Sequence, residues 1–396
     1  MESRASADVV VVGGGVIGLA IAWRASAAGH RVTVVDPSPG HGASWAAAGM
    51  LAPVGEAHFG EDALTRLNVA AARAWPGFVR DLEEASGTSV HYRTGGTLLV
   101  ASDASDRDAT DDVLRYQQEL GLAAHRLTSA QCRAAEPLLA PGISGGVELV
   151  EDHQVDNRRT VEALLGACRA ARIAFVDDEV AEVTSDIAGV TGVTLTRGGQ
   201  LRAASVVLAA GCWSGQVGGV PERLRPPVRP VKGLTVRLGV PDGAPRLART
   251  VRGLVRGRSC YLVPRPDGTV VVGATVEERG FDLTVQVASV VDLLDDARRL
   301  IPAIDDYELA ETTTGLRPGS PDNAPIVGPT GLAGLLVATG HYRNGFLLAP
   351  STADEVVRLL SLPDEAGRTD TGAFAGFRPA RFGPLAGAGG GALLRR

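Results

Sequence analysis

The sequence has few cysteines, one lysine and no long uncharged apolar run, and each shortage argues against a class of protein. Among its 396 residues, none of the four cysteines forms a C-x-x-C pair, so neither a zinc site nor a disulfide framework is expected at Cys132, Cys168, Cys212 or Cys260. The seven histidines show no H-x-x-x-H spacing, so no metal site is expected. No run of about 18 apolar residues is free of charge, which argues against a membrane span.

Charge and composition narrow the class further. The formal net charge of −6 argues against a nucleic-acid partner. One basic stretch, Arg223–Arg258, contains Lys232, the only lysine, and we interpret it as a solvated sheet face rather than an anion-binding patch. A hydrophobic fraction of 45% is typical of one large or two moderate globular domains. Because the first apolar strand follows Met1 within a few residues, we expect no signal peptide and a cytoplasmic location.

The most informative stretch follows the pattern of a dinucleotide-binding βαβ unit. It holds a β-branched strand, a G-x-G-x-x-G turn, a small-residue helix, a second strand and an acid, at Val9–Val12, Gly13–Gly18, Leu19–Ala28, Arg31–Val35 and Asp36. The glycines allow a tight turn, a close approach of the backbone to a pyrophosphate, and close packing of helix on strand. The helix N-terminus offers free N–H groups to phosphates. Asp36, 21 residues after Gly15, can accept hydrogen bonds from a ribose.

Hydrophobic periodicity predicts the remaining elements. Helices are expected over Asp62–Ser86 with a break near Pro76, Asp106–Leu120, Ser129–Ala135, after a cap at Asp156, over Leu283–Leu300, and over Phe346–Leu362 with a break near Pro350. Strands are expected as a hairpin over Tyr92–Ala101, a strand pair over Phe175–Val183, a hairpin turning at Gly198-Gly199, a strand-rich block over Val228–Thr314, and a buried strand over Gly334–Gly340.

These elements predict an α/β fold, α+β overall, in which a Rossmann-like domain is interrupted by an inserted antiparallel-sheet domain. The Rossmann-like domain is expected to be discontinuous, at residues 1–90, 148–227 and 316–366. The inserted domain is expected at residues 91–147 and 228–315. Residues 367–396 are rich in Gly, Ala, Pro and Arg without periodicity, so a disordered tail is expected there.

Six short motifs then give a resemblance to a known family. They are Ala46–Leu51, Pro230–Gly233, Cys260–Arg265, Val272–Thr275, Gly315–Gly319 and Gly340–Gly345, in this order along the chain. With them the chain resembles the D-amino acid oxidase superfamily of FAD-dependent amine oxidases, and within it the glycine oxidase family of thiazole biosynthesis. The resemblance covers about Asp8–Leu362. It implies that the Rossmann-like domain binds FAD and that the inserted domain binds the substrate.

The resemblance also implies a set of cofactor-binding residues. The glycine turn contributes Gly13, Gly15, Val16, Ile17 and Gly18, while Asp36 and Pro37 lie by the adenosine ribose. Phosphate and flavin contacts are implied for Ala43, Ser44, Ala48, Gly49 and Met50. Val180 is implied beside adenine and Gly211 beside the pyrophosphate. The flavin pyrimidine is implied to meet His341, Tyr342, Arg343, Asn344, Gly345, Phe346 and Leu347. A turn before a helix N-terminus aims N–H groups at the edge where reduced flavin carries negative charge.

The substrate residues implied by the resemblance are Tyr261, Arg317 and Arg343. Arg317 would hold the carboxylate bidentately, and Tyr261 would add a hydroxyl and a pocket wall. The implied reaction passes a hydride from a small amino acid to FAD, with oxygen as the final acceptor, and needs no acid–base residue. The resemblance further implies a homotetramer and a possible hand-over of the imine to a thiazole synthase.

Two departures and two alternatives stay open. Ser259 replaces a histidine sometimes found two positions before the tyrosine, and Trp45 stands where small hydroxyl residues are usual. One alternative is a sarcosine oxidase or D-amino acid dehydrogenase; sarcosine oxidases carry a flavin-linking cysteine where this chain has Gly315–Pro318, so non-covalent FAD is expected. The other alternative is a non-catalytic flavin-binding subunit, against which Tyr261 and Arg317 argue.

Overall fold

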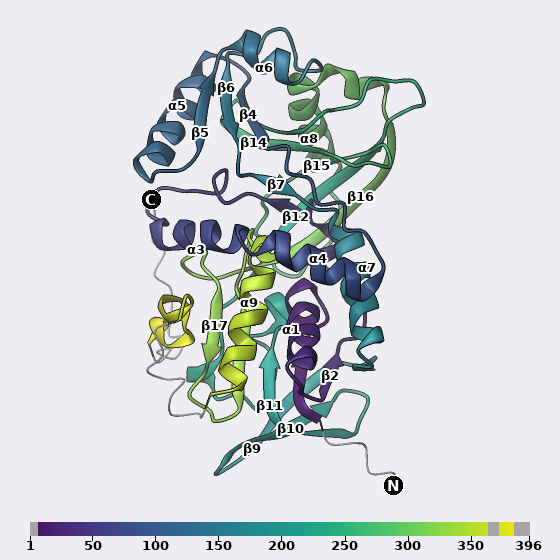
Figure 1. The fold of residues 1–396 in the computed structure, drawn as a ribbon, viewed down its shortest axis with the longest axis vertical. Helices are drawn as coiled ribbons and strands as arrows, with labels where there is room; N and C mark the ends of the chain where they lie inside the picture. Colours follow the sequence, from purple (N-terminus) through teal and green to yellow (C-terminus); the bar gives the residue numbers. More distant parts are fainter. Residues whose placement is uncertain (1–6, 363–371, 384–396) are drawn as a thin grey trace.

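The computed structural model describes residues 7–362 and 372–383, and within them two large sheets carry the fold (Figure 1). The first sheet has the order β17-β18-β11-β1-β2-β8, and β9 and β10 extend it from β11. The pairs β18–β11, β11–β1, β1–β2 and β2–β8 are parallel, as expected for a Rossmann-like sheet. Its strands are β1 (Ala7–Val12), β2 (Val32–Val35), β8 (Ala174–Val176), β9 (Val180–Asp186), β10 (Gly189–Leu195), β11 (Gln200–Leu208), β17 (Ile326–Pro329) and β18 (Leu335–Thr339).

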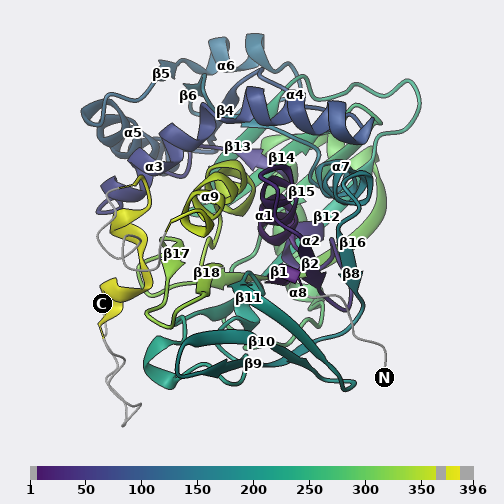
Figure 2. The same ribbon diagram turned by 60° about the horizontal axis from the view of Figure 1, so that its bottom comes forward.

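The first sheet is buried on both faces, which explains why β1 reads as an unbroken apolar run. Val9 and Val11 face a core shared with helices, whereas Val10 and Val12 face a core shared with β9–β11. The helices of that layer are α1 (Val16–Ala27), α3 (Asp62–Ala72), α4 (Trp75–Ser86), α7 (Asn157–Ala170) and α9 (Gly345–Leu360). Figure 2 shows α1 and α9 lying between α4 and the sheet. Each fully buried valine contributes about 1.5–3 kcal/mol to this packing.

The second sheet has the order β16-β12-β15-β14-β13-β4-β6-β5. It is antiparallel except for the pair β4–β13, which is parallel. Helix α8 packs on it through Leu293, Ala297 and Leu300. Its strands are β4 (Thr97–Ala101), β5 (Ala124–Leu127), β6 (Gly146–Leu149), β12 (Arg229–Gly239), β13 (Thr250–Val255), β14 (Arg258–Pro264), β15 (Thr269–Gly273) and β16 (Glu308–Gly319); its helices are α5 (Ala104–Glu119), α6 (Ser129–Ala135) and α8 (Val287–Leu300).

Two small elements and several short turns complete the described residues. Strands β3 (Met50–Leu51) and β7 (His153–Gln154) form a two-stranded pair, and α2 (Ala43–Ala46) follows the loop after β2. Single 3-10 turns occur at Gly211–Trp213, Glu222–Leu224 and Pro302–Asp306. Within residues 7–362 and 372–383, no helix is long and apolar enough to cross a membrane.

Two predicted strand pairings are wrong because the strands find partners far away in the sequence. Residues 92–101 form no hairpin: Arg93 bridges to Gln154, and β4 pairs with β6 and β13. The pair over 175–183 is also absent, because β8 joins β2 in parallel while β9 pairs with β10. The hairpin turning at Gly198-Gly199 is confirmed by the β10–β11 pairing.

The helix predictions hold with two differences. Asp156 caps α7 by accepting hydrogen bonds from the N–H groups of Arg158 and Arg159. Helix α9 is not broken at Pro350, because the proline is buried among the residues of α9 that pack on the core, which offsets its missing hydrogen bond. Helix α8 begins at Val287 rather than at Leu283, and the Thr284 carbonyl instead accepts a hydrogen bond from Lys232.

Two predictions about polar segments also need correction. Residues 372–383, expected to be disordered, form 3-10 turns at Ala375–Phe377 and Pro379–Phe382, and Phe374 and Phe377 are buried in the core; residues 363–371 and 384–396 lie outside the described residues. The basic stretch is not simply a solvated face, because Lys232, Arg237 and Arg252 are buried. Buried cations need partners; Arg252 lines the cavity described below, Lys232 lies next to it, and Arg237 donates a hydrogen bond to Asn157 Oδ1.

Candidate active site

A cavity of about 750 Å³ lies between the two sheets. This volume is in the range of sites that enclose a cofactor or a drug-sized ligand, about 300–1,000 Å³. Every sequence-predicted site residue lines the cavity except Gly18 and Leu347. A Cβ on Gly18 would overlap the Gly13 carbonyl oxygen, so this glycine permits α1 to pack on the turn. Leu347 is buried in the core, and its carbonyl accepts a hydrogen bond from the Trp75 indole.

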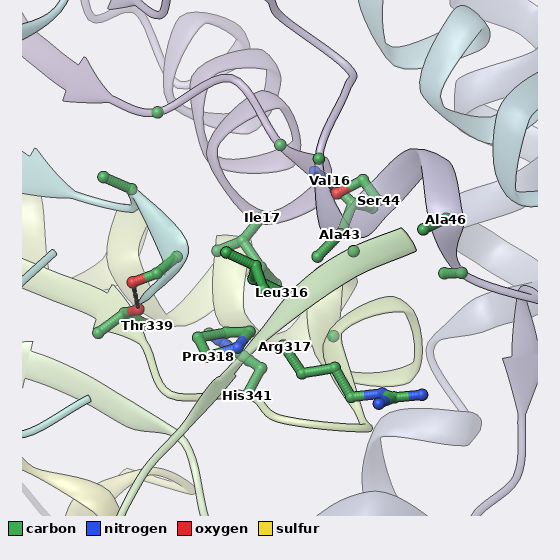
Figure 3. A pocket seen from close by; sticks show the side chains of 18 of the residues that line it. Val16, Ile17, Ala43, Ser44, Ala46, Leu316, Arg317, Pro318, Thr339 and His341 are labelled. Atoms are coloured by element: carbon green, nitrogen blue, oxygen red, sulfur yellow. Dashed lines mark hydrogen bonds between the residues drawn. The ribbon is translucent and has the colours of Figure 1, made fainter. Parts of the chain in front are cut away.

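One end of the cavity is formed by the glycine turn and the N-terminus of α1 (Figure 3). Gly13 has φ +106°, and a Cβ there would overlap the backbone of Ala209. The N–H of Val16 donates to Ser44 Oγ at 2.9 Å, so a hydroxyl lies at the helix start. Small side chains, the Ser44 hydroxyl and the N–H groups of the helix start can hold phosphates at this point.

Asp36 fixes the turn in addition to facing the cavity. Its Oδ2 accepts from the Gly14 N–H at 2.6 Å, and its Oδ1 accepts from the Ser38 N–H at 2.7 Å. Each carboxylate oxygen keeps further lone pairs, so the same side chain can accept from ribose hydroxyls. Val180 and Gly211, predicted at the adenine and the pyrophosphate, line the same cavity.

The turn between β18 and α9 forms a further wall. His341 bridges to Gly319, and its Nε2 lies 3.0 Å from Thr352 Oγ1. Burial lowers the pKa of His341 to about 3, so the imidazole is neutral at physiological pH. Gly345 and Phe346 start α9 and line the cavity, so the positive end of the α9 dipole faces it.

Arg317 extends from β16 into the cavity, with its guanidinium directed away from Thr339 (Figure 3). Its Nη1 donates to the Thr275 carbonyl at 3.1 Å and contacts the Lys232 carbonyl at 3.4 Å. A Cβ on Gly233 would overlap the guanidinium, so the glycine leaves room for it. Among the described residues nothing accepts a hydrogen bond from Nη2 or Nε. These two groups can therefore grip a carboxylate.

Tyr261 on β14 pairs with Gly273 on β15. A Cβ on Gly273 would overlap the phenol ring of Tyr261. Its hydroxyl has no hydrogen-bond partner within the part of the chain that the structure describes. Burial raises the pKa of Tyr261, the charge of Arg317 lowers it, and the charge of Glu56 raises it again. The hydroxyl is therefore protonated at neutral pH and available as a donor beside Arg317.

The sequence analysis missed a buried charged cluster at this end of the cavity. Arg252, opposite Tyr261 in the β13–β14 ladder, places Nη1 2.8 Å from Glu56 Oε1. Asp152 accepts the N–H groups of Val54 and Gly55, each at 2.9 Å, and so fixes the segment that carries Glu56. Burial raises the pKa of Asp152 to about 7, against the charge of Arg252. In the sequence this cluster appears only as part of the basic stretch that we interpreted as a solvated face, because Glu56 and Asp152 lie 196 and 100 residues before Arg252.

Arg343, the third predicted substrate residue, lies at the rim of the cavity. Its Nη1 lies 3.3 Å from His58 Nε2 and 3.7 Å from Glu56 Oε2, and its guanidinium stacks over the Tyr342 ring. The side chain is 35% exposed, so water screens it more than it screens Arg317.

Lys232 supports Arg317 from behind rather than lining the cavity. Its Nζ donates to the Thr284 carbonyl at 2.9 Å and to Gln286 Oε1 at 2.6 Å, and it forms an ion pair with Glu277 Oε2 at 2.9 Å. These contacts hold the segment whose Thr275 carbonyl accepts from Arg317. The lone lysine thus has a structural explanation.

The two departures from the family pattern have different outcomes. Ser259 lines the cavity, so it replaces the histidine with a smaller polar group at the same wall. Trp45 does not line the cavity. Its ring stacks on the His41 ring with the centroids 5.3 Å apart, and the Arg158 guanidinium carbon lies 4.1 Å from the centroid of the indole. All four cysteines are buried, and none lines the cavity. Within the described residues, no group of three His, Cys, Asp or Glu side chains could hold a metal ion.

The chain is similar to known proteins along almost its whole length. The sequence profile of a family described as FAD dependent oxidoreductase matches residues 8–359. The chain is 35% identical over 347 residues to the bifunctional protein ThiO/ThiG of Trichormus variabilis, covering 87% of this chain but 51% of that protein, about half its length. It is 29% identical to the hydrogen cyanide synthase subunit HcnC of Pseudomonas aeruginosa, covering 95% of this chain and 96% of that one. The crystal structure of glycine oxidase from Geobacillus kaustophilus superposes with a TM-score of 0.86 and 31% identity, covering 96% of this chain and 99% of that one.

Proposed function

The chain belongs to the family of FAD-dependent oxidoreductases, and from that premise we propose that it oxidises glycine, and with it sarcosine or small D-amino acids. The products are the imine or its oxoacid, ammonia and hydrogen peroxide. The observation that carries the proposal is Arg317, which lines the cavity beside Tyr261; within the described residues its Nη2 and Nε, and the Tyr261 hydroxyl, have no hydrogen-bond partner. Glycine has no side chain, so its carboxylate is the main handle by which a site can orient it.

FAD is the cofactor of this family, and the cavity suits it. The turn at Gly13 leaves no space for a Cβ, and the N-terminus of α1 offers N–H groups at the phosphate position. We propose that the glycine turn, Asp36 and the segment around Ala43–Met50 hold the dinucleotide, with the His341–Phe346 turn at the flavin. Non-covalent binding is supported by the four cysteines, all of which lie away from the cavity.

The residues of the chain act by binding and orienting. When bound, FAD supplies the two-electron acceptor. Arg317 and Tyr261 hold the substrate carboxylate, which fixes the direction of the Cα–H bond. Neutral His341 adds no positive charge beside the cofactor site, and the N-terminus of α9 favours negative charge that develops there. No acid–base residue is needed, provided that the amine arrives neutral.

Two wider parts of the proposal rest on the relatives. The name of the ThiO/ThiG relative joins two activities in one protein, which supports hand-over of the imine to a thiazole synthase. A homotetramer and a cytoplasmic location are proposed from the family resemblance.

The division into a cofactor domain and a substrate domain is supported by the two sheets, although β6 and β16 each cross an expected boundary.

The test is reduction of the bound flavin without oxygen. The purified protein should be yellow, and anaerobic glycine should bleach it, whereas D-phenylalanine should bleach it more slowly. Acid precipitation should release all colour into the supernatant. A flavin that glycine leaves oxidised would contradict the proposed activity, and faster reduction by D-phenylalanine would contradict the small-substrate specificity. Colour retained in the pellet would contradict non-covalent binding.

A further inference from the structure

We infer that Glu56 is a further substrate-binding residue of the site, and that its carboxylate accepts a hydrogen bond from the substrate amine. The inference rests on the proposed amino acid oxidation and extends it from the carboxylate to the nitrogen. Glu56 lines the same cavity as Arg317 and Tyr261. An amino acid held there by its carboxylate presents its nitrogen to another wall.

The two oxygens of Glu56 differ in their partners. Oε1 lies 2.8 Å from Arg252 Nη1, in an ion pair without hydrogen-bond geometry. Oε2 is buried and makes no hydrogen bond within the described chain; His58 Nε2 and Arg343 Nη1 lie 3.6 and 3.7 Å away. Glu56 lines the cavity and accepts no hydrogen bond from the described chain, so its carboxylate suits a ligand with an N–H donor.

The surroundings keep this carboxylate in place and ionised. Burial raises the pKa of Glu56, but the charge of Arg252, the contact with the His58 ring and the charge of Arg343 more than offset this, so the pKa lies well below the usual range. Asp152 anchors the preceding backbone at Val54 and Gly55. The group is therefore a fixed negative charge at a buried wall.

A fixed carboxylate at this place favours the oxidation itself. When the Cα–H bond breaks, its two electrons leave with the hydrogen as hydride to FAD, and the nitrogen lone pair forms the C=N bond. The nitrogen becomes positively charged as this happens. A carboxylate that accepts from its N–H is therefore bound more strongly in the transition state than in the neutral amine complex.

The first test needs no variant and compares two isomeric substrates. N-ethylglycine has one N–H on its neutral amine and N,N-dimethylglycine has none, while both contain the same atoms. Anaerobic flavin reduction by N-ethylglycine should be about 30-fold faster, within the range of one hydrogen bond to a charged group. Equal rates would overturn the inference.

The second test uses Glu56→Gln with Glu61→Gln as the matched control. Glu61 lies on the same segment but does not line the main cavity. Glu56→Gln should slow flavin reduction by glycine about 30-fold, whereas Glu61→Gln should keep the wild-type rate. Acetate, which offers a carboxylate and no amine, should bind both variants as it binds the wild type. Loss of acetate binding together with the rate would overturn the amine assignment.

The pH profile separates an amine contact from a structural effect. The negative charge of Glu56 raises the pKa of the bound amine, so Glu56→Gln should move the rise of the reduction rate to lower pH by about one unit. The groups facing Glu56 are Arg252, His58, Arg343, Asp152 and Tyr261, and all are retained in the variant. An unmoved profile contradicts the inference. Failure of glycine to bleach the wild-type flavin would contradict the proposed function instead.

Discussion

The two ends of the cavity are built in different ways. The cofactor end is made mostly of backbone and small side chains, and its phosphate-binding part, with Gly13, Val16 and Ser44, lies within a few tens of residues; Val180, Gly211 and the His341–Phe346 turn complete it from later in the chain. The substrate end is made of charged and polar side chains that come from residues 56 to 343, and these hold one another in place. A local motif can therefore specify the phosphate-binding part of the first end, whereas the second end exists only when both sheets have formed.

The energetics of the two ends differ accordingly. At the cofactor end, steric exclusion sets the geometry, because a single added Cβ would overlap backbone. At the substrate end, buried charges must be paired, and removal of one partner leaves the other uncompensated. Substitutions should thus cost cofactor binding at the first end and catalytic rate at the second, and this separation can be tested.

The largest effect is expected for Gly18→Ala. The added Cβ would overlap the Gly13 carbonyl oxygen, so α1 or the turn must move. We expect FAD binding to weaken by about 4 kcal/mol, or roughly a thousandfold, in the range of the severe steric mutations. Titration of the apoprotein with FAD, followed by flavin fluorescence, measures this. The control is Gly77→Ala on α4, where a Cβ would meet nothing within 4 Å; equal affinities for the two variants would contradict the steric account.

Arg317→Ala should show the opposite behaviour, a loss of rate with the cofactor retained. Removal of a bidentate charged contact costs about 3 kcal/mol, or roughly a hundredfold in kcat/KM for glycine. Arg317→Lys should recover part of this, since a point charge cannot reproduce the planar fork. Steady-state oxidase assays and the flavin content of the purified variants test both statements. Loss of flavin in Arg317→Ala would remove the separation between the two ends.

The sequence was most informative where local chemistry decides the structure. The βαβ unit of residues 8–36, the Asp156 cap and the two buried strands β11 and β18 could all be predicted, because spacing and residue type within a short window suffice. The order of the six motifs pointed to the family, and almost every predicted site residue lines the cavity.

The sequence was least informative where partners lie far apart. Nothing near Tyr92 indicates that β4 pairs with β13, some 150 residues later, so a hairpin was the natural expectation. Arg252 appears in the sequence as one arginine among many, and its pairing with Glu56 follows only from the meeting of β13 with the 54–61 segment. Phe374 and Phe377 lie in a Gly- and Arg-rich stretch that gave no periodic signal of burial.

A smaller effect is expected from His341, at the wall between the two ends. Burial lowers the pKa of His341 in the folded protein to about 3, from 6.5 in the unfolded chain. Between these two pH values the unfolded chain binds more protons than the folded protein, so the free energy of unfolding falls as the pH drops below 6.5. From pH 8 to pH 5 this one group should cost about 2 kcal/mol of unfolding free energy. Urea unfolding with saturating FAD should show that His341→Gln loses less stability over this interval than the wild type does. The exposed His125→Gln is the control; the same pH dependence in all three proteins would contradict the assignment.

The smallest effect is expected for Arg343→Ala, which tests how far the charged end extends. Arg343 and Arg317 both line the cavity, but Arg343 is a third exposed and lies 3.7 Å from a carboxylate that is already paired with Arg252. Water screens such a rim charge, so its loss should cost about 1 kcal/mol, roughly fivefold in kcat/KM, and the difference should shrink as salt is added. The hundredfold cost of losing Arg317 should be less sensitive to salt, because that contact is shielded from solvent. Parallel assays of the two variants at low and high salt compare them directly. If Arg343→Ala proved the more damaging of the two, Arg343 would be the residue that binds the substrate carboxylate, and the substrate would lie at the rim of the cavity rather than beside Tyr261.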